Sequence, residues 1–195
     1  MRLETTACII LASGFSRRFG AKNKLLSPFK GKPLAAHCAA LAAALPVHTT
    51  LGIIQPGDRA MADLFGSAGI GLMENPKADE GQGASLSLAV RHIEPLPVTA
   101  AIVLLADMPF VSARHIETLV NQIGESDAAA SQHNNVLQPP LLFARSVFPQ
   151  LRKLSGDRGG KAVLNSLEHV EAVEMNAHEA TDIDTPEKLA EYTGN

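Results

Sequence analysis

A loop of small and basic residues follows the first apolar run of the chain. Residues Ala7–Ala12 have the unbroken hydrophobicity of a strand that is buried on both faces, and Ser13, Gly14, Arg18 and Lys24 come after them. Small residues let backbone N–H groups approach phosphate oxygens, and an arginine fork and a lysine ammonium can neutralise a polyphosphate. The loop has neither the P-loop spacing nor G-x-G-x-x-G. It therefore predicts an anion site of another kind, with an ordinary turn carrying surface cations as the alternative.

Charge is distributed unevenly along the chain, although the net formal charge is only −3. Between Thr5 and Gly57 there is no Asp or Glu. The cations of this stretch are Arg17, Arg18, Lys22, Lys24, Lys30 and Lys32. Residues 168–195 are strongly acidic, with Lys188 as their one Lys or Arg. The basic segment indicates a local anion site, with a solvated basic face as the alternative, and the overall charge argues against a nucleic-acid partner.

Asp107 is the carboxylate best placed to work with the first loop. It comes directly after the apolar run Ala100–Ala106 and shortly before Pro109. Ligands of open parallel sheets bind beyond the carboxyl ends of the strands, so we expect Asp107 and the first loop on one rim. A carboxylate there can hold Mg²⁺ that bridges nucleotide phosphates. Capping of the turn before Pro109 is the alternative role.

Two further carboxylates lie near the end of the chain. Asp182 and Asp184 are two positions apart, so on an extended segment their side chains point the same way. Asp184 also lies three residues before Glu187, the spacing of a capping box, so a helix cap is its alternative role.

Alternating strands and helices must position these residues. The patterns predict strands at 7–12, 51–54, 70–73 and 100–106, and helices at 33–45, 58–65, 85–93 and 112–123, with Asp58 and Ser112 as caps. After Gly124 we expect strands at 128–130 and 141–143 around a turn, helices near 148 and at 161–166, a strand at 170–173, and a last helix capped by Thr185. This order predicts one α/β domain over residues 1–195. It is a Rossmann-like three-layer sandwich whose mostly parallel sheet has an antiparallel excursion.

Composition narrows the class of protein. The 195 residues are 46% hydrophobic, which is enough for a core. Only 4% are aromatic and Trp is absent, which argues against a surface on which the bases of single-stranded nucleic acid could stack. No apolar run approaches the ~18 residues of a membrane span, and the N-terminal run is too short for a signal peptide. Cys8 and Cys38 form no disulfide framework and, like His37, are expected in the core. We therefore expect a cytoplasmic protein without a membrane or nucleic-acid partner.

Several motifs together resemble one family. Residues 11–20 (LASGFSRRFG) and 24–26 (KLL) resemble the L-A-x-G-x-S-x-R-[M/F]-G…K-L-L signature of MobA-like nucleotidyltransferases, which activate molybdopterin. Residues 81–86 (GQGASL), 104–109 (LLADMP), 156–161 (GDRGGK) and 182–187 (DIDTPE) follow in the order of that family. The resemblance covers nearly the whole chain, and it implies a fold of the nucleotide-diphospho-sugar transferase type.

The resemblance implies a role for each matching position. It implies nucleotide binding by Leu11, Ala12, Ser13, Gly14, Arg18, Lys24, Gln82, Gly83 and Ser85. Arg18, Lys24 and Asp107 are then catalytic, and Asp107 and Asp184 hold Mg²⁺. Arg158 and Lys161 are assigned to the acceptor's phosphate, since residues 156–161 precede a helix whose N-terminus can receive an anion, with a plain surface loop as the alternative. Asp182 is also assigned to the acceptor.

The implied reaction moves CMP from CTP onto the phosphate of molybdopterin and releases pyrophosphate, and a molybdoenzyme is a further partner. Ala12-Ser13-Gly14 is closer to the Ala-Ala-Gly of molybdenum cofactor cytidylyltransferases, the MocA-like group, than to the Gly-Gly of guanylyltransferases. Where the family often has Gly-His-Pro, this chain has residues 137–140 (LQPP), so the acceptor stays open. The alternatives are GTP as donor, a sugar or polyol phosphate as acceptor, and a non-catalytic nucleotide-binding accessory protein for molybdoenzyme maturation.

Overall fold

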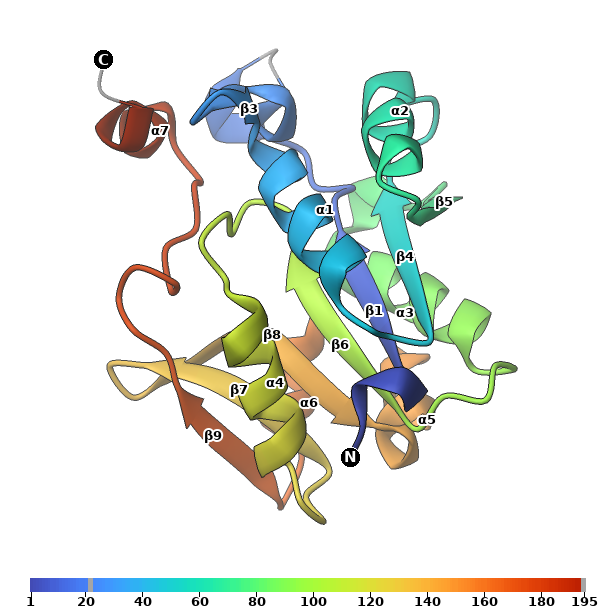
Figure 1. Cartoon of the computed structure of the whole chain (residues 1–195). Coiled ribbons are helices and arrows are strands. Elements are labelled where there is room, and N and C mark those ends of the chain that lie inside the picture. The colour runs from blue at the N-terminus through green and yellow to red at the C-terminus, as the bar shows by residue number, and fades with distance from the viewer. Residues whose placement is uncertain (21–22, 194–195) are drawn as a thin grey trace.

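The computed structural model describes residues 1–20 and 23–193, so Lys22 of the basic segment lies outside the described residues. Within them a seven-stranded sheet forms the centre of the molecule (Figure 1). Across the sheet the strands are β5 (Gly71–Glu74), β4 (Thr49–Ile54), β1 (Thr6–Leu11), β6 (Ala100–Leu105), β8 (Val136–Ala144), β7 (Ala128–His133) and β9 (Val170–Glu174). Strand β8 is antiparallel to β6 and β7, while the other neighbouring strands are parallel. The mostly parallel sheet with an antiparallel excursion is confirmed.

Helices cover both faces of the sheet and make three layers. Along β1, Cys8 and Ile10 pack toward one face and Ile9 and Leu11 toward the other, as the alternation of a strand requires. One face carries α1 (Leu34–Ala44), α2 (Arg59–Ser67) and α4 (Ala113–Gln122), and the other carries α3 (Gln82–Ile93), α5 (Phe148–Leu151) and α6 (Gly160–Leu164) (Figure 1). The predicted three-layer sandwich is confirmed. None of the described helices is long and apolar enough to span a bilayer.

Three predicted helix caps are confirmed. The side chains of Asp58, Ser112 and Thr185 accept hydrogen bonds from backbone N–H groups three residues later, at 3.1, 3.2 and 3.2 Å. Helix α3 differs from prediction, because it begins at Gln82 rather than at Ser85. Its N-cap is Gly81, which has the positive φ of 112° that favours glycine. Ser85 therefore lies inside the first turns of α3 and does not cap it.

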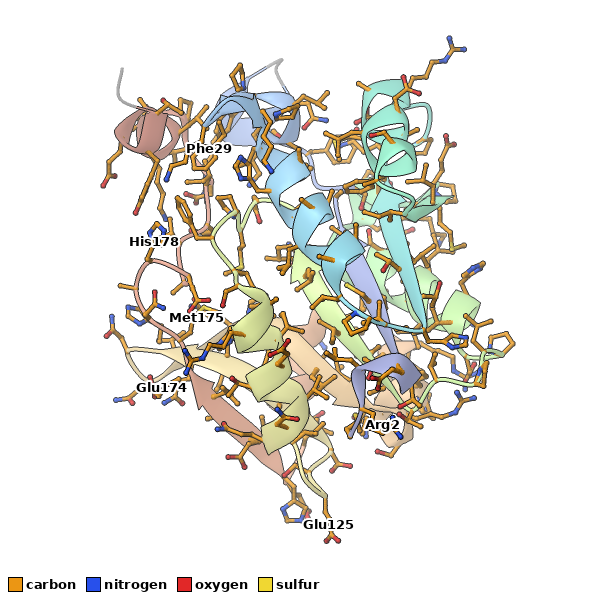
Figure 2. All side chains as sticks on the ribbon, viewed as in Figure 1. Arg2, Phe29, Glu125, Glu174, Met175 and His178 are labelled. Atoms are coloured by element: carbon orange, nitrogen blue, oxygen red, sulfur yellow. The ribbon has the colours of Figure 1, made fainter. Side chains whose placement is uncertain are left out.

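A short hairpin at one end of the sheet was not predicted. It consists of β2 (Pro28–Phe29) and β3 (Lys32–Pro33), which are too short to show a periodic pattern. Phe29 is buried with Ile183, and Phe110 links it to Tyr192 of the last helix, α7 (Pro186–Thr193), with ring centroids 5.6 and 5.1 Å apart. Figure 2 shows Phe29 and His178 at the same end of the molecule. This cluster holds the segment around Ile183 close to the sheet.

Short 3₁₀ helices complete the connections. They are η1 (Leu3–Thr5), η2 (Arg17–Phe19), η3 (Lys24–Leu26), η4 (Ala78–Glu80) and η5 (Arg145–Val147). Three of them, η2, η3 and η4, belong to loops that follow the carboxyl ends of β1 and β5.

Candidate active site

A cleft of about 310 Å³ opens at the carboxyl ends of the parallel strands. It is lined by Leu11, Ala12, Ser13, Gly14 and Phe15 of the first loop, Lys24 and Leu25 of η3, Ala78, Asp79, Gly81, Gln82 and Ser85 between β5 and α3, Leu105 and Asp107 after β6, and Asp157. This is the position at which open α/β sheets bind ligands.

The strand order sets the direction of the cleft. The first loop follows β1, Asp107 follows β6 on one side of it, and η4 follows β5 on the other. Neighbouring strands lie about 4.8 Å apart, so the ends of β5 and β6, three strands apart, are about 14 Å from each other. We call the Asp107 side the β6 end of the cleft and the η4 side its β5 end.

Lys24 and Asp107 form an ion pair at the β6 end, with Nζ and Oδ2 2.5 Å apart. Their side chains are only 17% and 19% exposed. The backbone N–H of Lys24 donates to Ser16 Oγ at 3.1 Å, and Asn23 Oδ1 accepts from the next backbone N–H at 3.0 Å. The small polar residues of the first loop thus orient the turn that carries the lysine.

Arg18 and Asp184 form a second ion pair beside the first. The backbone N–H of the buried Ile183 donates to the carbonyl oxygen of Asp107 at 2.9 Å, which brings Asp184 to the end of β6. Because Thr185 caps α7 and Asp184 instead pairs with Arg18, the helix-cap alternative for Asp184 is wrong.

The carboxylate of Asp107 fits a site that a cation completes. Its Oδ1 atom is buried and has no hydrogen-bond partner among the described residues, while Oδ2 contacts Lys24. A buried acceptor without a partner is costly unless a ligand satisfies it. Mg²⁺ typically takes one or two carboxylates together with phosphate oxygens and waters. Asp107 and Asp184 match that donor set.

The β5 end holds a buried, neutral hydrogen-bonded network, and Asp79 and Asp157 also line this end. Ser13 Oγ and Ser85 Oγ are 2.6 Å apart, and Asn75 Nδ2 donates to Ser85 Oγ at 2.9 Å. The backbone N–H of Lys77 donates to Asn75 Oδ1 at 2.9 Å, which fixes the orientation of the amide. Ser13, Ser85 and Asn75 are 4%, 1% and 2% exposed.

This network leaves one hydroxyl hydrogen for a ligand. Because Asn75 already donates to Ser85 Oγ, the two serines share one hydrogen bond and retain one O–H donor between them. Sequence reasoning missed Asn75. The available signal was its place directly after β5, at the strand end where a side chain can reach the cleft.

The predicted acceptor loop lies against the N-terminus of α3. The backbone N–H of Gly83 donates to the carbonyl oxygen of Gly156 at 2.9 Å. A Cβ on Gly83 would overlap with Arg158 O and lie 2.8 Å from Gly156 O. We expected Gly83 to let the nucleotide approach closely. Its missing side chain instead lets the backbone of residues 156–158 approach α3. Gln82, predicted beside Gly83, does line the cleft.

Several predicted residues do not line the cleft, and these include Arg18 and Asp184, whose ion pair lies beside it. Arg158 and Lys161 are exposed and lie outside its lining. Asp182 Oδ1 forms an ion pair with Lys188 Nζ at 2.8 Å, whereas Asp184 pairs with Arg18, so the two carboxylates do not contact the same group. Asp157, from the same loop as Arg158, was missed and does line the cleft.

The cysteines belong to the core, as expected. Cys8 and Cys38 are buried, and burial raises the pKa of Cys8 to about 12 and that of Cys38 well above its ordinary value. His37 Nε2 contacts the carbonyl oxygen of Phe29 at 3.0 Å, and partial burial lowers its pKa. Buried neutral thiols are poor nucleophiles, so neither cysteine suits covalent catalysis.

Comparison with known families agrees with this geometry. The model of the MobA-like NTP transferase domain matches residues 8–172. The purine catabolism protein PucB of Bacillus subtilis (strain 168) is 31% identical over 199 aligned residues, which cover 96% of each chain.

Solved structures share the fold at lower identity. Rv0371c from Mycobacterium tuberculosis H37Rv superposes with a TM-score of 0.82 at 21% identity over 100% of both chains. Its manganese complex superposes with a TM-score of 0.77 at 19% identity, over 98% of this chain and 99% of that one. Molybdopterin-guanine dinucleotide biosynthesis protein A from Archaeoglobus fulgidus gives a TM-score of 0.74 at 20% identity, over 96% and 97%.

Proposed function

Because the chain belongs to the MobA-like NTP transferase family, we propose that it moves CMP from CTP onto the phosphate of a molybdopterin-type acceptor. It is a nucleotidyltransferase of the MobA-like kind, and the proposal concerns its substrates and the roles of its residues. The single observation that carries it is the Lys24–Asp107 ion pair, which lines the β6 end of the cleft, with the Arg18–Asp184 pair beside it and outside the lining.

In the proposed reaction, a phosphate oxygen of the acceptor attacks the α-phosphorus of CTP. The bond from that phosphorus to the oxygen bridging to the β-phosphate breaks, and pyrophosphate leaves. The attacking phosphate is already ionised at neutral pH, so no general base is required. Lys24, Arg18 and the loop amides would position the triphosphate and stabilise its developing charge. Mg²⁺ held by Asp107 and Asp184 would supply further neutralisation of phosphate charge.

The two ion pairs indicate how the site accepts its ligands. Each cation expected to contact phosphate is now paired with a carboxylate expected to contact metal. Binding then exchanges partners, because Lys24 and Arg18 turn to phosphates while Asp107 and Asp184 turn to the metal. Each pair neutralises its own two charges until both ligands are present.

The β5 end supports a cytosine base. Ala12-Ser13-Gly14 leaves little side-chain volume there, and the Ser13–Ser85 pair retains one O–H donor. The pairing edge of cytosine presents two adjacent acceptors, whereas that of guanine presents two donors beside one acceptor. A fixed donor therefore favours CTP, with GTP as the alternative.

Other parts of the proposal rest on the sequence motifs. Three of them stay predictions. These are nucleotide binding by Leu11 and Gly14, contact of Arg158 and Lys161 with the acceptor, and a nucleotidyltransferase domain that spans residues 1–195. The cytoplasmic location, which fits two free cysteines, also stays a prediction. The name of the Bacillus relative favours a molybdoenzyme of purine catabolism as the partner.

The test is a turnover assay with purified protein, Mg²⁺ and molybdopterin. Equal concentrations of CTP and GTP should give faster pyrophosphate release with CTP, measured as kcat/KM, and mass spectrometry should detect the cytidylylated acceptor. Sugar and polyol phosphates serve as competing acceptors. A preference for GTP would overturn the choice of base, and a lack of turnover with every pair would favour the accessory-protein alternative.

A further inference from the structure

Asp157 places an acidic side chain in a cleft that otherwise fits an anionic ligand. It lines the β5 end, where its carboxylate packs against Gly81 so closely that a Cβ there would overlap with Oδ1. Among the described residues its carboxylate has no ion-pair or hydrogen-bond partner. A carboxylate repels phosphates, so this end of the cleft suits an uncharged part of the ligand that can donate a hydrogen bond.

Among the described residues, the carboxylate of Asp157 makes no hydrogen bond that would hold its loop in place or cap a helix. The loop is seated on α3 through the backbone, by the Gly83 N–H donating to the Gly156 carbonyl oxygen at 2.9 Å. The N-cap of α3 is Gly81, and no side chain caps that helix terminus. The carboxylate of Asp157 is therefore exposed toward the cleft with its acceptor capacity unused.

Its position in the cleft indicates which part of a nucleotide it meets. The cations for phosphate, Lys24 and Arg18, lie with Asp107 at the β6 end. Phosphates, ribose and base follow one another in a nucleotide, so the opposite end of the cleft receives the base. Gly81, against which Asp157 packs, belongs to that end because it follows β5 and η4.

We propose that Asp157 is a specificity-determining residue, which accepts a hydrogen bond from an amino group of the bound base. This inference rests on the proposed nucleotidyl transfer and deepens it. An ionised carboxylate can only accept hydrogen bonds. It favours cytosine, whose 4-amino group donates, and it disfavours uracil, whose carbonyl oxygen at the same position would face it without a hydrogen between them.

The experiment measures binding of CTP and UTP by calorimetric titration in Mg²⁺, without acceptor. The wild-type chain should bind CTP at least ~10-fold more tightly than UTP, the effect of one charge-assisted hydrogen bond. In Asp157→Asn the amide can both donate and accept, so this ratio should fall to within about threefold. Asp79→Asn is the matched control. It removes the same charge from the same cleft and should change both affinities equally.

Each outcome decides the matter. A CTP-to-UTP ratio that Asp157→Asn leaves unchanged, or wild-type affinities that are equal, would overturn the inference while nucleotidyl transfer stands. If Asp157→Asn instead removes discrimination between CTP and its 2′- or 3′-deoxy analogue, the carboxylate meets the ribose and the assignment to the base is wrong. A wild-type chain that binds no nucleoside triphosphate would overturn the proposed function as well. Melting temperatures identify any loss that comes from unfolding.

Discussion

The ion pairs at the β6 end of the cleft and the hydrogen-bonded side chains at its β5 end differ in charge and in burial. At the β6 end, Lys24–Asp107 and Arg18–Asp184 are charged pairs, and Arg18 is 68% exposed. At the β5 end, Ser13, Ser85 and Asn75 are neutral, nearly completely buried and joined by hydrogen bonds. An exposed ion pair such as Arg18–Asp184 contributes little to stability and exchanges partners readily, whereas the side chains of Lys24 and Asp107 are only 17% and 19% exposed. A buried neutral network is costly to break, because each group left without a partner has lost its water.

This difference separates two tasks. The charged end can rearrange when phosphates and metal arrive, since Arg18 is exposed and Asp107 Oδ1 has no hydrogen-bond partner among the described residues. The neutral end keeps its shape, so it can present the same donor to every base that enters. The predictions below break one end at a time, in order of decreasing expected effect.

Asp107→Asn should have the largest effect. The substitution removes the carboxylate that we propose holds Mg²⁺, so turnover should fall at least ~10²-fold. This corresponds to a loss on the order of 3 kcal/mol of transition-state stabilisation. The melting temperature should barely change. Pyrophosphate release is the measurement, and Asp127→Asn, at the start of β7 and outside the cleft lining, is the control. Normal turnover in Asp107→Asn would remove this residue from the mechanism.

Lys24→Ala tests contact with the triphosphate. Loss of a charge-assisted hydrogen bond, worth roughly 1.5–3 kcal/mol, should weaken CTP binding about ten- to a hundredfold. Cytidine, which lacks phosphates, should bind almost as before. Calorimetric titration of both ligands measures this, with Lys32→Ala as a control from the same basic segment. Equal losses for CTP and cytidine would show that Lys24 acts through folding or the base.

Asn75→Ala disrupts the hydrogen-bonded network of Ser13, Ser85 and Asn75 at the β5 end. Ser85 loses the donor that orients it, so the free energy of unfolding should fall by about 1–3 kcal/mol. Affinity for cytidine should fall too. Ser131→Ala removes an equally buried hydroxyl that donates to the carbonyl oxygen of Pro140 at 2.8 Å, outside the cleft lining. It should lower stability without changing cytidine binding. Chemical denaturation and titration distinguish the two variants, and unchanged cytidine affinity in Asn75→Ala would contradict the assigned role.

Asp184→Asn should produce the smallest effect, and one of opposite sign. It frees Arg18 from an exposed pair worth up to about 1 kcal/mol, so CTP binding in EDTA should strengthen by up to about fivefold. The gain in affinity on adding Mg²⁺ should shrink, because one proposed metal ligand is lost. Weaker metal-free binding in the variant would contradict the exchange of partners.

The sequence predicted much of the fold because its signals are local. Apolar runs marked β1 and β6, and the caps Asp58, Ser112 and Thr185 marked three helix starts. The start of α3 was placed three residues late, since Gly81 caps without a side chain and leaves no polar signal. The hairpin of β2 and β3 was missed because two-residue strands carry no periodicity.

By itself, the sequence determined the order of strands and helices, the loop that follows the first strand, and the residue types available for phosphate and metal. Only the tertiary structure decided which of them meet. Lys24 pairs with Asp107, 83 positions later, because β1 and β6 are neighbours in the sheet. Arg18 pairs with Asp184, 166 positions later, because the Ile183 N–H donates to the carbonyl oxygen of Asp107 and holds this segment at the end of β6. Asn75 belongs to none of the motifs, and Asp157 lies in a motif (residues 156–161) that was assigned to the acceptor. Their roles depend on burial and on the absence or presence of partners, and these are properties of packing rather than of local sequence.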